Sequence, residues 1–359
     1  MIKKIILGIL IIVGVFLIIA VLSDKKNGDN GSVEKDLPPA EKIFKTGVVP
    51  TERTFKVGVA PIPKGFSGPG TGDWIGMFPK IPEVAEIVTA QNEWRDSKEK
   101  SGEIPEILQL IQMQSKTYNY TPQFGIMFIQ GEDKIILDTP NNPINGWSNE
   151  DGKKLYEKTA LNICKTYNAK YLALGIEVNT YFVNFGEEKF DEFVAVYKEM
   201  YDNLKSQCPN TKIFVTFQLE KMKGIGAKTF GKKIAPQWNL INKFGNKLDL
   251  IAFTSYPEVE YKSPNDMPSD YYSEITKHTN KTIAITELGW ADDDGTFIKK
   301  FIELTNGMNI EFVSWIFMHD LDFKNFVPLS KTGLIKSDGA PKKAWYEWKK
   351  LKEIPLKKQ

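Results

Sequence analysis

Cysteine, histidine and arginine are scarce in this 359-residue sequence, which contains only two of each. A structural zinc site takes four closely spaced cysteine or histidine ligands. The residues Cys164, Cys208, His278 and His319 are too few and too scattered to suggest such a site. We therefore expect neither a metal nor another cofactor.

The sequence also lacks an excess of either charge. Lys and Arg together number 47 and Asp and Glu 45, which leaves a formal net charge of +2. Binding to nucleic acid relies on a basic footprint that neutralises phosphates, so no nucleic-acid partner is expected. The composition, 42% hydrophobic and 26% charged, is that of an ordinary globular protein and excludes disorder of the whole chain.

The longest apolar run lies at the N-terminus, from Ile5 to Leu22. As a helix, these residues would span about 27 Å, close to the hydrocarbon thickness of a bilayer. The run exceeds the usual h-region of a cleaved signal peptide, and no A-x-A-like site follows it. We interpret residues 1–23 as a signal anchor, 24–50 as a linker and 51–359 as the folded domain. The expected protein is monomeric and crosses the cell membrane once through residues 5–22, with its domain outside the cytoplasm.

From residue 55 onward, short apolar runs alternate with longer amphipathic segments, the pattern of a parallel sheet with crossover helices. Eight candidate strands cover residues 55–61, 85–91, 124–129, 171–176, 212–217, 250–256, 282–286 and 312–317. The pattern predicts an α/β fold of the (β/α)8 TIM barrel type. The alternative, an open doubly wound sheet, usually carries a Gly-rich phosphate turn after its first strand. The segment APIPKGFSGPGTGDW contains no G-x-G-x-x-G motif.

Both cysteines fall near the ends of predicted helices. One helix follows Ser148, the expected N-cap, and carries Cys164; the next leads to Cys208. In a barrel these helices are neighbours that run in the same direction, and an extracytoplasmic location permits a disulfide. Two separate buried thiols remain equally compatible with the sequence.

Two candidate strands end on a carboxylate, in YLALGIEVNTYF at Glu177 and in TIAITELGW at Glu287. The carboxyl ends of all barrel strands meet at one mouth, and the fourth and seventh strands lie across it from each other. Paired carboxylates are the groups that cleave glycosidic bonds, one as acid/base and the other as nucleophile or base. The alternative is that both are surface glutamates in loops.

The chain resembles clan A of the glycoside hydrolases, retaining β-glycosidases on a (β/α)8 barrel that include endo-β-1,4-galactanases, cellulases and mannanases. The resemblance covers most of residues 55–352. It implies a carbohydrate substrate, Glu177 as acid/base and Glu287 as nucleophile. It also implies that Tyr256 orients the nucleophile and that Trp315 forms the floor of the sugar site.

Further substrate-binding residues are expected around the mouth. Arg95 resembles an arginine that bonds the nucleophile in some clan members, although a surface salt bridge explains it equally well. Trp94 and Trp290 are candidates for stacking on sugar rings, with loop packing as the alternative. Gln218 and Glu220, at the end of the fifth candidate strand, are candidates for bonding sugar hydroxyls.

One residue departs from the clan pattern. Members usually carry an asparagine before the acid/base that bonds the sugar 2-hydroxyl, and Ile176 occupies this place. In a regular strand Ile176 would face the helices, whereas Asn179 would lie on the side of the glutamate. Asn179 or Asn92 is therefore expected to replace the missing contact. The departure leaves open a second function, a carbohydrate-binding or cell-surface barrel with impaired catalysis.

A third function, a cytoplasmic barrel enzyme that uses a phosphorylated substrate, is disfavoured by the N-terminal apolar run. No Gly-rich phosphate loop follows the seventh or eighth candidate strand. In the favoured reading, the apolar neighbours Ile176, Val178 and Phe182 are expected to keep Glu177 protonated near neutral pH.

Overall fold

The computed structural model describes residues 52–62, 76–93, 102–130, 134–139, 141–321 and 329–357. The expected anchor at 1–23, the linker at 24–50, Trp94 and Arg95 lie outside these ranges. Within them, no helix combines the length and apolarity required to cross a membrane.

The core is a parallel sheet of nine assigned strands in the order β7-β6-β3-β2-β1-β11-β10-β9-β8. They are β1 (Lys56–Val59), β2 (Ile87–Glu93), β3 (Thr121–Met127), β6 (Tyr171–Leu174), β7 (Lys212–Phe214), β8 (Thr216–Gln218), β9 (Ile251–Ser255), β10 (Ile283–Leu288) and β11 (Ile310–Trp315). A separate antiparallel pair is formed by β4 (Ile129–Gln130) and β5 (Lys134–Ile135).

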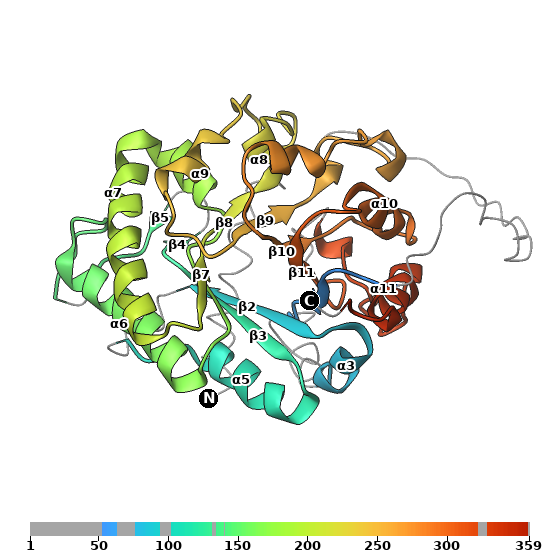
Figure 1. Cartoon of the computed structure of the whole chain (residues 1–359), viewed down its shortest axis with the longest axis horizontal. Coiled ribbons are helices and arrows are strands. Elements are labelled where there is room, and N and C mark those ends of the chain that lie inside the picture. Colours follow the sequence, from blue (N-terminus) through green and yellow to red (C-terminus); the bar gives the residue numbers. More distant parts are fainter. Residues whose placement is uncertain are drawn as a thin grey trace, which may run out of the picture.

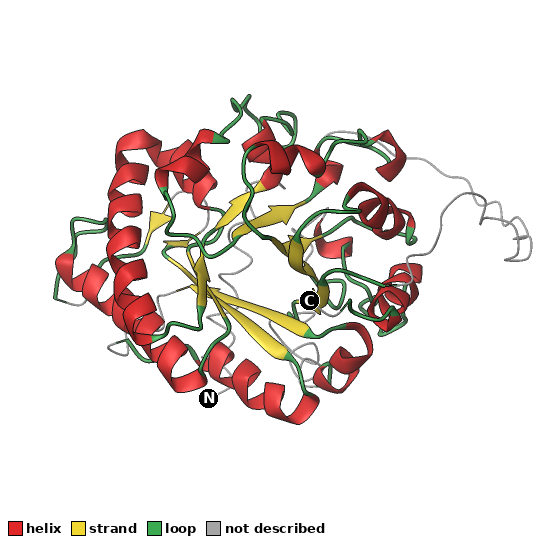
Figure 2. Ribbon diagram, viewed as in Figure 1, coloured by secondary structure: helices red, strands yellow, loops and turns green. Residues whose placement is uncertain are grey.

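The two ends of this sheet are halves of one strand. Only Val215 separates β7 from β8; β7 pairs with β6 on one side, and β8 pairs with β9 on the other. The sheet therefore closes as eight parallel strands. Figures 1 and 2 show these strands at the centre of a ring of helices. All eight candidate strands are present, which confirms the predicted (β/α)8 barrel.

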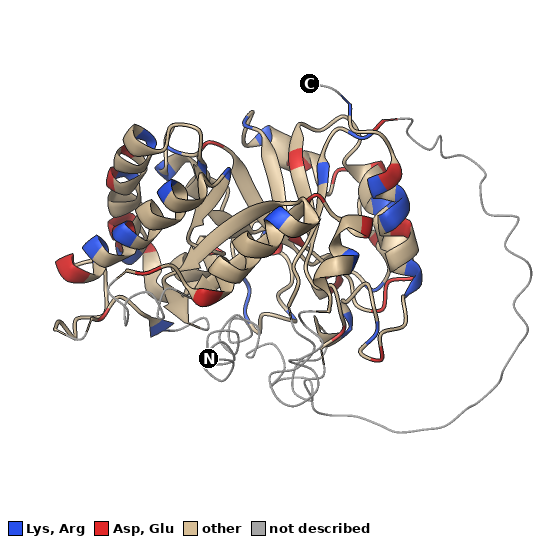
Figure 3. Ribbon diagram, turned by 90° about the horizontal axis from the view of Figure 1, so that it is seen from below, with Lys and Arg blue, Asp and Glu red and all other residues tan. Residues whose placement is uncertain are grey.

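The ring consists of α3 (Ile81–Val84), α5 (Glu106–Tyr118), α6 (Glu150–Tyr167), α7 (Val178–Gln207), α8 (Leu219–Lys223), α9 (Asn239–Lys243), α10 (Thr296–Leu304) and α11 (Lys343–Glu353). Short 3-10 turns complete it, namely η2 (Phe78–Lys80), η3 (Pro257–Val259), η4 (Pro264–Asp266), η5 (Ser273–Lys277) and η6 (Leu329–Lys331). Between β9 and β10 the crossover contains the turns η3, η4 and η5 instead of an α-helix. Charges of both signs lie mostly on these outer elements (Figure 3).

A hydrogen bond across the barrel interior identifies the inward face of the strands. Thr89 on β2 donates to Ser314 on β11 at 2.8 Å, and β1 lies between those two strands. Gly58 on β1 makes this bond possible, because a Cβ there would lie 2.2 Å from the Ser314 hydroxyl. Side chains alternate along a strand, so Gln91 faces inward with Thr89, and Trp315 faces outward.

The helix α6 begins one residue later than predicted. Its N-cap is Asn149, not Ser148, and the Asn149 Oδ1 accepts a hydrogen bond from the Gly152 N–H at 3.0 Å. The Asn149 Nδ2 also donates to the carbonyls of Leu137 and Ile144. A hydroxyl at position 148 could not replace these contacts, so asparagine both caps the helix and holds the preceding loop.

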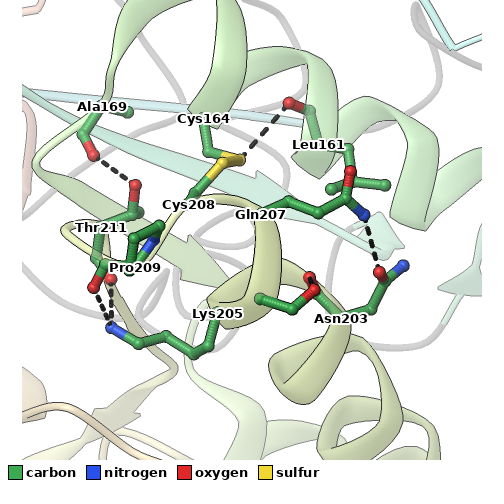
Figure 4. The surroundings of a disulfide bond; sticks show 10 residues. Leu161, Cys164, Ala169, Asn203, Lys205, Gln207, Cys208, Pro209 and Thr211 are labelled. Carbon is green, nitrogen blue, oxygen red and sulfur yellow. Dashed lines mark hydrogen bonds between the residues drawn. A yellow bond between two sulfur atoms is a disulfide. The ribbon is translucent and has the colours of Figure 1, made fainter.

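A disulfide joins the ends of α6 and α7. Cys164 lies in the last turn of α6 and Cys208 caps α7, and their Cα atoms are 6.3 Å apart (Figure 4). The pairing that the sequence left open is therefore formed. Next to it, Thr211 donates to the Ala169 carbonyl, so the chain leading into β7 is bonded to the chain leading into β6.

The lower end of the barrel, where the strands begin, is closed by charged groups. Arg53 bonds Glu86 at 2.7 Å, and its backbone pairs with residues 355 and 357. The two ends of the described domain therefore meet below the strands. Glu311 sits at a register shift in β11 and accepts hydrogen bonds from Tyr171 and Lys212 on other strands.

Candidate active site

Glu287 faces the barrel interior because β10 contains an extra residue. Ile285 pairs with Phe253, but Glu287 pairs with Thr254, so Thr286 forms a bulge. In a regular strand Glu287 would point out to the helices with Ile285. A bulge adds one residue and turns the following side chain to the other face. The candidate nucleophile thus reaches the mouth through a local irregularity.

Glu177 does not lie on a strand. The strand β6 ends at Leu174, Gly175 adopts a φ of 115°, and Glu177 adopts the left-handed conformation with φ of 49° and ψ of 46°. That conformation is costly for a residue with a side chain, and such strain concentrates at functional sites. The Glu177 N–H donates to the Thr216 hydroxyl at 2.8 Å, which holds the turn before α7 begins at Val178.

The two carboxyls are buried, and each accepts a hydrogen bond from a residue on β9 or directly after it. Thr254 on β9 donates to Glu177 Oε1 at 2.6 Å, and the hydroxyl of Tyr256, directly after β9, donates to Glu287 Oε2. Glu177 and Glu287 are each only 4% exposed. The contact that the resemblance implied for Tyr256 is present.

Burial, followed by the nearby Glu177 charge, raises the pKa of Glu287 to about 8. The Tyr256 hydroxyl and the neighbouring Gln91 side chain act in the opposite direction. A neighbouring like charge disfavours ionisation, so Glu177 adds to the effect of burial. The raised pKa thus falls on Glu287, the candidate nucleophile, which must be ionised to attack.

Two expected substrate contacts are instead used inside the protein. The Asn179 amide donates to the Gln218 carbonyl and to Gln237, and accepts from the Gln218 N–H, all at 3.0 Å or less. The prediction that Asn179 faces the site assumed a strand, but α7 has already begun there. Gln218 caps α8 by accepting from the Lys221 N–H and donates to Glu220. Neither side chain points free amide groups at the mouth.

Ile176 and Asn92 also differ from expectation. Ile176 does not face the helices: its Cδ1 lies 3.0 Å from the place of a Cβ on Gly125, beside Gln91. The turn at Gly175 ends the strand alternation and brings this apolar side chain inward. Asn92 lies within β2, which continues to Glu93, and its side chain is fully buried on the outward face. Asn92 therefore cannot reach a sugar in this structure.

The expected floor of the sugar site is a core residue. Trp315 faces outward, is fully buried against Trp348 of α11 and donates its indole N–H to the Thr332 carbonyl at 2.6 Å. Trp315 follows the inward-facing Ser314, and successive side chains of a strand point to opposite faces, so Trp315 faces the helices. Trp290, after β10, is 8% exposed and packs on Phe297 of α10 with ring centroids 5.1 Å apart. Packing therefore accounts for Trp290 better than sugar stacking.

Three polar residues at the pair were missed from the sequence: Gln91, Thr216 and Thr254. Each is buried and lies within or near the end of an apolar strand. A polar side chain on the inward face of such a strand is the signal that could have identified them, once the register was known. Among the described residues, no group of three or more His, Cys, Asp or Glu side chains could hold a metal ion.

Comparisons with known proteins support the fold. No family profile matches the sequence, and no curated protein matches it either. Solved structures do match in three dimensions. An exo-β-1,4-mannosidase from Opitutaceae bacterium strain TAV5 has a TM-score of 0.62 at 13% identity, over 85% of this chain and 60% of that one. The chain has the same barrel fold.

Two further structures share this (β/α)8 barrel. A family 39 glycoside hydrolase from Bacteroides cellulosilyticus WH2 has a TM-score of 0.59 at 15% identity, over 85% of this chain and 64% of that one. GH5_18 from Bifidobacterium longum subsp. longum has a TM-score of 0.59 at 15% identity, over 86% and 82%. The chain thus spans less than two thirds of the mannosidase and of the family 39 protein. At such identity the likeness concerns the fold alone.

Proposed function

We propose that the chain is a glycoside hydrolase that cleaves β-glycosidic bonds of a polysaccharide or glycan with retention of configuration. The observation that carries this proposal is the buried pair Glu177 and Glu287, in which the Glu177 charge raises the pKa of Glu287 and each carboxyl receives a hydroxyl donor from the β9 segment. Glycoside cleavage needs one protonated and one ionised carboxyl at the same bond. The barrel shared with an exo-β-1,4-mannosidase and a family 39 glycoside hydrolase supports the same assignment.

In the proposed reaction, Glu287 attacks the anomeric carbon while Glu177 protonates the departing oxygen. Glu177 then takes a proton from the water that releases the sugar from Glu287. The Tyr256 hydroxyl stabilises the ionised form of Glu287 before the attack, because a hydrogen bond to a charged form favours that form. The Thr254 hydroxyl fixes the Glu177 carboxyl through Oε1.

The test uses a panel of activated aryl β-glycosides with two variants. Glu287→Ala should abolish hydrolysis, and added azide should yield no product of retained configuration. Glu177→Ala should form the covalent intermediate quickly and then stall, and azide should release it as the retained β-glycosyl azide. An alanine variant with wild-type turnover at either position would refute the assignment.

A second function is favoured by a specific observation, the apolar Ile176 beside Gln91 without a compensating amide from Asn179 or Asn92. Loss of contacts to the 2-hydroxyl removes several kcal/mol of transition-state stabilisation in glycosidases. In this alternative the barrel binds carbohydrate on the cell surface with impaired catalysis. Polysaccharide binding without turnover, unchanged in both alanine variants, would identify this function.

We also propose that residues 5–22 anchor a monomeric chain in the cell membrane, with the barrel outside the cytoplasm. The disulfide between Cys164 and Cys208 supports this location, because disulfides persist in oxidising compartments. Membrane fractionation of cells that express the full chain, followed by protease treatment of intact cells, tests it. Recovery of the chain in the cytosolic fraction would overturn the proposal.

A further inference from the structure

A third buried carboxyl lies behind the proposed catalytic pair. Glu220 is in the first turn of α8, at the mouth end of the fifth barrel strand, and is fully buried. Among the described residues no lysine or arginine pairs with it in a salt bridge. Burying a carboxylate without a cationic partner costs free energy unless hydrogen bonds compensate for the lost water. The hydrogen-bond partners of Glu220 therefore decide how it can be buried.

Four donors converge on this carboxyl. Its Oε1 accepts from the Tyr271 hydroxyl at 2.6 Å, the Ser255 hydroxyl at 2.9 Å and the Tyr256 N–H at 3.0 Å. Its Oε2 accepts from the Gln218 Nε2 at 2.6 Å. Two of these donors belong to the chain segment that leaves β9, which is the segment that carries the Tyr256 hydroxyl to Glu287.

We propose that Glu220 is a positioning residue that seats the Tyr256 hydroxyl on Glu287. The backbone N–H of Tyr256 is bound by Glu220, and the side chain of the same residue is bound to Glu287. A carboxylate that accepts three hydrogen bonds through one oxygen fixes the turn after β9 in one conformation. This inference rests on the proposed glycosidase function only for its effect on turnover.

The electrostatics agree with this geometry. Burial raises the pKa of Glu220 to about 7, while the bonds from Tyr271, Ser255 and the Tyr256 N–H act in the opposite direction. The Glu220 charge contributes, after burial and the charges of Glu287 and Glu177, to raising the pKa of Tyr256, which keeps the phenol proton available for donation. Among the described residues, the Glu220 charge also contributes to the raised pKa values of Tyr271, Tyr272, Tyr261 and Glu258, for all of which burial is the largest cause.

Glu220→Gln keeps the size of the side chain but replaces one carboxylate oxygen by an NH2 group. That group would face the Gln218 Nε2, which is also a donor, so the hydrogen bond between the two side chains is lost. The exchanged pair Gln218→Glu with Glu220→Gln restores one donor and one acceptor at that contact. It also leaves an oxygen at position 220 for Tyr256, Ser255 and Tyr271. Tyr271→Phe removes one donor without touching Tyr256 or Glu287. Glu303→Gln, on the exposed side of α10, is the matched control.

The first readout needs no substrate. In the full-length chain labelled with 13C at glutamate carboxyls, the resonance lost in Glu287→Gln identifies Glu287. We expect the titration midpoint of Glu287 to rise by about 1 pH unit in Glu220→Gln, because a less well placed Tyr256 hydroxyl favours the ionised form of Glu287 less. Tyr271→Phe should produce a smaller rise, and the exchanged pair should return toward the wild-type midpoint.

The second readout is the kinetics with an aryl β-glycoside. Glu220→Gln should lower kcat about tenfold with little change in KM. An unchanged Glu287 midpoint in folded Glu220→Gln and Tyr271→Phe, or the same loss in Glu303→Gln, would overturn the positioning role. A wild-type chain that hydrolyses no substrate would instead refute the proposed function, while the titration would still decide the role of Glu220.

Discussion

At the scale of single residues, the hydroxyl of Tyr256 is the donor that controls the ionisation of Glu287. Its hydrogen bond opposes the rise of the Glu287 pKa that burial and Glu177 produce. In Tyr256→Phe that pKa should therefore rise above about 8. Because Glu287 must be ionised to attack, the acidic limb of kcat/KM should move to higher pH. The loss of the donor should reduce kcat roughly 10- to 100-fold.

This prediction is measured as a pH–rate profile of kcat/KM between pH 5 and 10. Tyr346→Phe is a suitable control, because Tyr346 is exposed on α11. An acidic limb that stays in place or moves to lower pH in Tyr256→Phe would show that the hydroxyl does not stabilise the ionised carboxylate.

The structure brings the predicted residues Glu177, Glu287 and Tyr256 together, but the faces of their neighbours were predicted wrongly. Strand alternation was applied through Glu177, although the positive φ of Gly175, directly after Leu174, already ends the alternation. Glu287 reaches the interior only because of the bulge at Thr286, and nothing in TIAITEL marks a bulge. The type of residue at a strand end could be read from the sequence, whereas its direction depends on local backbone irregularities.

At the scale of elements, the loop before α6 is held by one side chain. Asn149 caps the helix through Oδ1 and bonds the Leu137 and Ile144 carbonyls through Nδ2. Loss of an N-cap costs about 0.5–2 kcal/mol. The buried carbonyls left without a donor add to this cost. We expect Asn149→Ala to lower the free energy of unfolding by about 2–4 kcal/mol.

Urea unfolding followed by circular dichroism measures this difference. The control is Asn306→Ala, since Asn306 is exposed in the turn after α10. Equal unfolding midpoints for Asn149→Ala and the control would rule out the double role of Asn149.

All eight barrel strands follow from the sequence because buried parallel strands leave apolar runs bounded by helices. The crossover between β9 and β10 does not follow. There the chain uses η3, η4 and η5 in place of a helix, in a stretch rich in Pro, Asp and Ser that gives no helical period. The split of the fifth strand at Val215 is also invisible, because it depends on which neighbour each half pairs with.

At the scale of the whole molecule, several buried acids make stability depend on pH. Burial raises the pKa of Glu287 to about 8 and those of Glu220 and Glu258 to about 7. The folded state then binds protons more tightly than the unfolded state. The resulting stabilisation is complete below the unfolded pKa, about 4.5, and is lost as the pH rises through 7 and 8. The melting temperature should therefore fall between pH 5 and pH 9.

Thermal unfolding at each pH measures this dependence, and Glu287→Gln should flatten it. Glu311 has a lowered pKa through its bonds to Lys212 and Tyr171, against the effect of burial, so its contribution is lost only at more acidic pH. The window from pH 5 to pH 9 therefore isolates the acids with raised pKa. A melting temperature that rises through this window would contradict the linkage.

The disulfide joins two helices, and its cysteines are 44 residues apart in the sequence, so the bond closes a loop of about that length. Closing such a loop limits the unfolded chain, which is worth typically about 2–4 kcal/mol. Replacement of both cysteines by serine should lower the free energy of unfolding by this amount without moving the pH–rate profile. The comparison is between oxidised wild type and the double variant in urea. A lower kcat in the double variant, with an unchanged pH–rate profile, would show that loss of the disulfide also disturbs the mouth of the barrel.

The pairing of Arg53 with residues 355 and 357 places both ends of the described domain beneath the strands, at the pole opposite Glu177 and Glu287. Under the membrane anchor that we propose, attachment through residue 52 would hold this underside toward the bilayer and leave the mouth with Glu177 and Glu287 facing away from it.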